Sequence, residues 1–213
     1  ADRHNALLVN GQGQSARPRG RPVVTRLQVR PRFVWAAVDL TECYRSNDSR
    51  FDNPAAQKVV REFVFLREPA VLIILDRVTV GIPEDIVAFN WHYRSEGDEL
   101  PVTLLPTGRD VQVFEYSAQL PEGSPYRGFR RVVRTTTYAL ERQLLHVFGS
   151  EATLDVNNGA SEDAWWQITL VNAPTTPVLF PMGPDVGWLV VGSEEPPEAV
   201  QEIQADADGV RWI

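Results

Sequence analysis

The chain has 213 residues, of which 43% are hydrophobic and 23% are charged, a composition typical of a folded globular protein. Its formal net charge of -7 argues against general binding to nucleic acid, which requires a basic surface. The single cysteine excludes an internal disulfide, and no apolar run approaches the ~20 residues that cross a bilayer. We therefore expect no nucleic-acid partner and no membrane span.

Short runs rich in Val, Ile, Phe, Trp and Thr recur along the chain between Gly, Pro, Asn and Asp, the pattern of antiparallel strands and turns. In chain order the predicted strands are residues 6–10, 23–29, 33–40, 59–66, 71–80, 86–93, 111–116, 131–138, 144–148, 153–156, 166–171, 178–180 and 188–191. Residues 61–65 alternate in polarity, whereas residues 71–75 are apolar throughout and require cover on both faces. We predict an all-β fold, an antiparallel β-sandwich of two or more stacked sheets with few short helices.

The organisation of the chain is predicted to be simple. Helix is expected only over residues 53–61 and 137–145, too little for a doubly wound α/β fold. We expect residues 1–213 to form a single domain, with residues 14–22 as the nearest thing to a linker and residues 194–213 as either a tail or a terminal strand. Because the chain starts at Ala1 without an initiating Met, we expect it to be a piece of a longer protein, and the resemblance described below implies that it is the C-terminal part.

Three sequence features invite a functional interpretation that the surrounding residues do not support. Gly11-x-Gly13 follows a strand, but Pro18 and Pro22 would break the helix that a phosphate-binding turn requires, so we predict a hairpin turn. The three histidines lie in separate strands and show no two-ligand spacing, so spacing alone predicts no metal site. Cys43 lies among polar residues and is expected to be structural rather than nucleophilic.

Candidate carbohydrate-binding residues come from two places. Arg17, Arg19 and Arg21 are close enough in sequence to bind one carboxylate or sulfate together, and the alternative is a solvated loop. Trp91 and His92 are candidates for contacts with a sugar ring, and the alternative is that they are ordinary strand residues.

The most specific stretch is residues 4–14, His-Asn-Ala-Leu-Leu-Val-Asn-Gly-Gln-Gly-Gln. It is similar to a segment of heparinase II/III-like polysaccharide lyases that begins with His-Asn, continues through a short apolar run and a small polar residue, and ends in Gly and Gln. The features of residues 38–44, 61–66, 75–78 and 89–92 follow in the same order as in that family. The resemblance covers residues 1–95, and beyond them the chain is similar only as a β-rich continuation. Ala6 departs from the usual Thr or Ser, and the basic loop is not a feature of the family.

The resemblance implies an α-helical toroid upstream of antiparallel β-sandwich layers, in a periplasmic or secreted enzyme that cleaves uronic-acid polysaccharides by β-elimination. That reaction requires neutralisation of the uronate carboxylate, a base for the C5 proton and an acid for the leaving oxygen. In the family a Tyr and a His, helped by an Asn or a Glu, lie upstream of the His-Asn motif, so we expect no catalytic residue in this chain. The expected partners are an anionic polysaccharide and the upstream toroid.

The resemblance also implies a structural zinc ion, held in several relatives by an upstream His and Asp together with the histidine of the His-Asn motif. Only that last ligand has a counterpart here, His4. His4 is therefore a candidate zinc ligand only in the presence of upstream partners, and no cofactor is expected in this segment alone. The alternative function is a non-catalytic carbohydrate-binding or structural β-sandwich module.

Overall fold

The structure is a computed structural model that describes residues 6–93, 102–105, 111–117, 129–135, 139–157, 165–181, 189–192, 205–206 and 209–210, with side chains over 7–89, 139–155, 165–180 and 189–192. Its strands are β1 (Ala6–Val9), β2 (Val23–Val29), β3 (Phe33–Asp39), β4 (Ala56–Leu66), β5 (Val71–Val80), β6 (Val87–Tyr93), β7 (Val102–Leu105), β8 (Val111–Ser117), β9 (Phe129–Thr135), β10 (Glu141–Phe148), β11 (Ala152–Asn157), β12 (Trp165–Leu170), β13 (Ala173–Pro181), β14 (Val190–Val191), β15 (Ala205–Asp206) and β16 (Gly209–Val210). The helix found in this part of the chain is α1 (Thr41–Tyr44).

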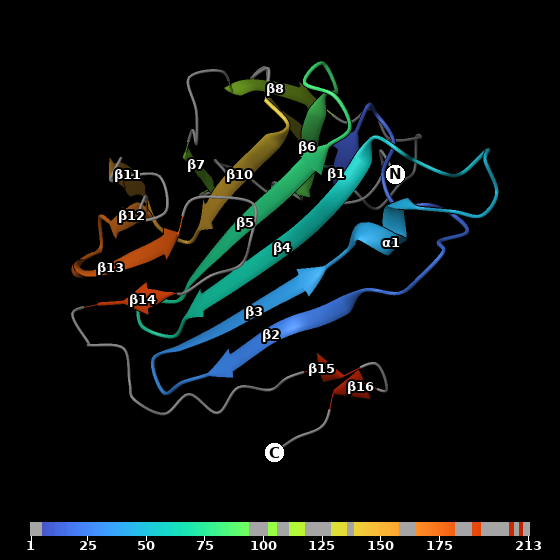
Figure 1. The fold of residues 1–213 in the computed structure, drawn as a ribbon. Coiled ribbons are helices and arrows are strands. Elements are labelled where there is room, and N and C mark those ends of the chain that lie inside the picture. Colours follow the sequence, from blue (N-terminus) through green and yellow to red (C-terminus); the bar gives the residue numbers. More distant parts are fainter. Residues whose placement is uncertain are drawn as a thin grey trace, which may run out of the picture.

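The strands form three larger antiparallel sheets (Figure 1). The central sheet has the order β2-β3-β4-β5-β10-β7, the first sheet has the order β1-β6-β9-β8, and the third sheet has the order β11-β12-β13-β14. Strands β15 and β16 form a separate hairpin within residues 194–213. The predicted all-β, antiparallel fold is therefore confirmed.

The central sheet is buried on both faces because side chains of successive strand residues point to opposite sides. On one face Ile74 and Val78 of β5 join a core with Leu7 of β1 and Phe89 of β6. On the other face Ile73 and Leu75 of β5 pack with side chains of the third sheet, which are Trp166, Ile168 and Phe180. Two separate cores thus lie on either side of the central sheet, as the apolar run of residues 71–75 predicts.

Each face of the β4–β5 pair also holds one buried ion pair. Arg61 and Asp76 are directly opposite partners in the ladder, with Nε of Arg61 2.7 Å from Oδ1 of Asp76. On the opposite face Glu62 accepts hydrogen bonds from Nε of Arg77 at 2.5 Å and from Nε1 of Trp35 at 3.0 Å. Glu62 is 1% exposed, so the polar positions of the alternating segment do not face solvent. Strand β4 is covered on both faces, and the alternation of polar and apolar residues along one strand cannot show this.

Both predicted helices are wrong. Residues 56–61 belong to β4 and residues 141–145 to β10, because each segment finds antiparallel partners across the central sheet. Tertiary pairing of this kind overrides weak local helix preference. The short helix α1 and the strand β7 were not predicted, whereas β15 and β16 lie in the segment that was expected to be a tail or a terminal strand. None of the helices in the described residues is long and apolar enough to cross a membrane.

Candidate functional site

The basic loop of residues 14–22 is packed against α1 and the turn that follows it. Ser15 donates its backbone N–H to the carbonyl of Cys43, Arg19 to that of Arg45 and Gly20 to that of Glu42, over 2.8, 2.8 and 3.3 Å. A Cβ at Gly20 would lie 2.7 Å from Cβ of Glu42, closer than real side chains approach, so glycine is required here. The interpretation of this segment as a linker is therefore wrong, because its backbone is hydrogen-bonded to the sandwich.

The three arginines of this loop do not converge on one site. Arg19 donates from Nε and Nη2 to both carboxylate oxygens of Glu42, and this hydrogen bonding lowers the pKa of Glu42. Arg17 lies 3.7 Å from a carboxylate oxygen of Asp48, with its guanidinium 5.5 Å from the ring centre of Phe51. Arg21 is exposed and forms no ion pair with the described residues. The loop therefore presents one uncompensated cation, not three.

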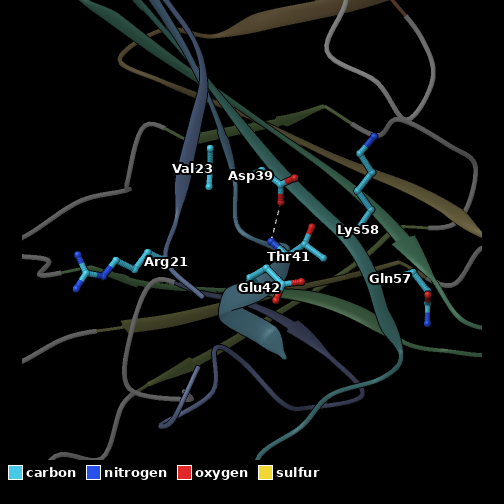
Figure 2. Close-up of a pocket in the computed structure, with 7 residues that line it drawn as sticks. All are labelled: Arg21, Val23, Asp39, Thr41, Glu42, Gln57 and Lys58. Carbon is cyan, nitrogen blue, oxygen red and sulfur yellow. Dashed lines mark hydrogen bonds between the residues drawn. The ribbon is translucent and has the colours of Figure 1, made fainter. Parts of the chain in front are cut away.

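Arg21 lines a pocket of about 320 Å³ at the end of the central sheet where α1 lies. Figure 2 shows its lining residues, which are Arg21, Val23, Asp39, Thr41, Glu42, Gln57 and Lys58. Arg21 and Lys58 stand on opposite flanks of Asp39 and Thr41 and extend away from each other (Figure 2). The volume is near the lower end of the range for small-molecule sites, and the lining residues include both cations and carboxylates.

The floor of the pocket is held by the junction of β3, α1 and β4. Oδ1 of Asp39 accepts the backbone N–H of Thr41 at 2.8 Å, and Oγ1 of Thr41 accepts the backbone N–H of Val59 at 3.0 Å. These bonds fix one oxygen of Asp39 and leave the other as an acceptor for a ligand hydroxyl. Arg21 and Lys58 supply cationic donors on the flanks. The lining therefore combines two cationic side chains with two carboxylates, Asp39 and Glu42.

Sequence analysis identified Arg21 alone among these lining residues. Asp39, Thr41 and Lys58 come from three different elements, and no spacing in the sequence indicates that they meet. Residues 38–44, which include Asp39, Thr41 and Glu42, were noted only as part of the resemblance and not as a site.

The remaining predicted site residues are only partly described. The backbones of Trp91 and His92 lie in β6, opposite Arg131 and Arg130 of β9, and their side chains fall outside the described residues. His4 is outside them too, so its role as a zinc ligand stays a prediction. Within the described part of the chain no group of three His, Cys, Asp or Glu side chains could hold a metal ion.

Two predictions of ordinary structure are confirmed. Asn10 and Gly11 have φ values of 52° and 77°, and they connect a Val9–Gln12 pair that exchanges backbone hydrogen bonds of 2.9 and 3.0 Å. Positive φ at both central residues is typical of a type I′ hairpin turn. Cys43 is 5% exposed and burial raises the pKa of its thiol, so it is a structural residue.

No model of a protein family matches the sequence, and no curated protein matches it. Solved structures do match. Heparan sulfate lyase HepC from Pedobacter heparinus superposes with a TM-score of 0.58 over 87% of this chain at 10% identity, and a mutant of that lyase with a TM-score of 0.54 over 84% at 10% identity. The fold of this chain is similar to part of a heparan sulfate lyase. The matched part is 31% of the HepC chain and 30% of the mutant's, so this chain spans about a third of those proteins.

This likeness agrees with the resemblance that residues 4–14 indicated, at the level of fold. At 10% identity it assigns no activity and no individual site residue to this chain.

Proposed function

We propose that this chain is the β-sandwich part of a polysaccharide lyase and that it binds an anionic polysaccharide at the pocket beside α1. The observation that supports this most is the likeness to heparan sulfate lyase HepC over 84–87% of the chain. Heparan sulfate is a polyanion of uronate and sulfated amino sugar residues, so a partner of this kind requires cationic donors. Arg21 and Lys58 of the pocket provide such donors on an otherwise acidic chain.

Bond cleavage is assigned to groups outside this chain. β-Elimination requires a base and an acid that reach the sugar ring. Of the Tyr and His side chains that the structure describes, Tyr44 is 1% exposed and His146 is 0% exposed. Tyr44 donates its hydroxyl to the carbonyl of Leu7 at 2.9 Å, and burial raises the pKa of its phenol. His146 packs against Phe89 with 5.2 Å between ring centres. Neither side chain is placed to contact a polysaccharide.

Titration of the chain with heparan sulfate oligosaccharides in a calorimeter tests the binding site. Arg21→Gln and Lys58→Gln should each weaken binding about 2- to 5-fold, as expected for the loss of one exposed charge contact. The matched control is Arg67→Gln, which removes an exposed cation after the far end of β4, roughly 30 Å from Lys58 at about 3.3 Å per residue. An equal loss in all three variants, or no loss in the pocket variants, would contradict the assignment.

A non-catalytic carbohydrate-binding module is the second candidate function, and the burial of Tyr44 and His146 agrees with it as well as with the lyase. Both functions predict the same binding, but they differ in the reaction of the whole protein. If the chain belongs to a lyase, the protein that contains it should release products with ultraviolet-absorbing unsaturated ends from a uronate polysaccharide, whereas the chain alone should release none. A whole protein that binds the polysaccharide without releasing such products would be a binding protein.

A further inference from the structure

Arg142 is a buried cation whose hydrogen-bonding capacity is only partly used. It lies on β10 and is 3% exposed. Its Nη2 donates to the backbone carbonyls of Pro83 and Asp85, at 2.6 and 3.3 Å. Nε and Nη1 are also buried, and no described residue offers either of them an acceptor within hydrogen-bond distance. A guanidinium has five N–H donors and does not lose its proton in proteins, so both its charge and its remaining donors must be accommodated.

Asp85, whose charge acts on Arg142, does not meet this need. Asp85 belongs to the loop between β5 and β6 that caps Arg142, but Oδ1 of Asp85 accepts Nδ2 of Asn10 at 2.7 Å and Oδ2 accepts the backbone N–H of Ile82 at 3.0 Å. The hydrogen bond from Asn10 lowers the pKa of Asp85, which therefore stays ionised. Burial lowers the pKa of Arg142. The charge of Asp85 raises it by less, so the pKa of Arg142 lies below its usual value.

The loop over Arg142 is held in place by the turn at Asn10. The backbone N–H of Asn10 donates to the carbonyl of Ile86, and the backbone N–H of Ile86 donates to Oδ1 of Asn10, both over 2.8 Å. The loop therefore holds the carbonyls of Pro83 and Asp85 against Nη2 of Arg142. Because the guanidinium is planar, these contacts also fix the positions of Nε and Nη1. Such a pre-organised, partly satisfied group differs from a flexible surface arginine, which water would solvate on all sides.

We propose that Arg142 is the centre of a binding site for a small monovalent anion, which accepts hydrogen bonds from Nε and Nη1. A buried donor without a partner costs about 1–3 kcal/mol and more when it is charged, so native proteins satisfy such groups with water or an ion. Water would satisfy the donors but leave the charge uncompensated, whereas an anion satisfies the donors and also compensates the charge. Chloride and a small carboxylate such as acetate share this chemistry.

The site is separate from the pocket and independent of the proposed function. Arg142 points to the same face of the central sheet as Leu144, whereas Lys58 points to the face of Val60 and Glu62. At 3% exposure Arg142 is out of reach of a polysaccharide, and a structural role for the anion follows: it would fasten β10 to the loop that Asn10 holds.

Replacement of gluconate by chloride at constant ionic strength, followed by thermal unfolding, tests the proposal. The melting temperature of the wild-type chain should rise by about 2–4 °C and saturate, as expected for ligand linkage in a domain of this size. Acetate in place of chloride distinguishes the two ligands. Arg142→Met should lose the response, and the control Arg67→Met, an exposed cation, should retain it. An equal response in Arg142→Met would overturn the site.

Crystals of the wild-type protein soaked in bromide give an answer that does not depend on the variant folding. The expected result is an anomalous difference peak within hydrogen-bond distance of Nε and Nη1 of Arg142. A site that holds water, or a side chain of the protein, in place of bromide would overturn the proposal.

Discussion

The buried pair of Glu62 and Arg77 makes the sharpest prediction about stability. Replacement of Glu62 by Gln keeps the size of the side chain but removes the charge that faces Nε of Arg77 at 2.5 Å. Both residues are 1% exposed, so solvent cannot compensate Arg77. Loss of one partner from a buried pair costs about 3–5 kcal/mol. Since domains are stable by only about 5–15 kcal/mol, Glu62→Gln should remove a large share of the free energy of unfolding.

Urea unfolding followed by tryptophan fluorescence and circular dichroism measures this loss, and coincidence of the two transitions checks that unfolding is two-state. The double variant Glu62→Gln/Arg77→Met should recover part of the stability because no uncompensated charge remains. The control is Arg50→Gln, which breaks an exposed pair with Asp48 and should cost less than about 1 kcal/mol. A loss below about 1 kcal/mol in Glu62→Gln would refute the reasoning that the pair is desolvated.

The remaining predictions concern the loop beside α1 and the chain terminus. Gly20→Ala should lower the melting temperature by several degrees, because its Cβ would clash with Glu42, whereas Gly81→Ala meets its nearest atom at 3.5 Å and should be tolerated. Hydrogen bonding from Arg19 lowers the pKa of Glu42, so its contribution to stability is present at neutral pH and lost as the pH falls below about 4. Urea midpoints across this range should decrease less steeply in Glu42→Gln than in the wild type. His4→Ala should leave the zinc content of this chain, measured by elemental analysis, unchanged, since one ligand binds zinc weakly.

The strands of the central sheet were the most predictable part of the fold. The boundaries of β2 and β5 match the sequence prediction because β-branched and apolar residues fill both segments and turn residues end them. The helix prediction for residues 53–61 failed because local helix preference is a weak signal. The pairing of this segment with β3 and β5 depends on residues far away in the sequence. Gly11 after β1 was sufficient to predict a hairpin turn, and the φ values of the structure add its type.

The candidate site was much less predictable. The sequence placed Arg17, Arg19 and Arg21 together, but it contains no information on register, and only the folded chain brings Glu42 against Arg19. The same limit applies to Arg61 and Asp76, whose pairing follows from the β4–β5 register. Charges that appear available in a sequence are therefore often neutralised by partners from distant segments.

The central claim, that this chain binds an anionic polysaccharide, is tested most directly by one comparative titration. Heparan sulfate and its desulfated, carboxyl-reduced form, matched in length, are titrated against the wild-type chain at the same ionic strength. The account predicts saturable binding of the native polysaccharide that weakens as salt is added, and at least tenfold weaker binding of the uncharged form, about 1.4 kcal/mol. Equal affinity for the two polymers, or no binding of heparan sulfate at low salt, would contradict it.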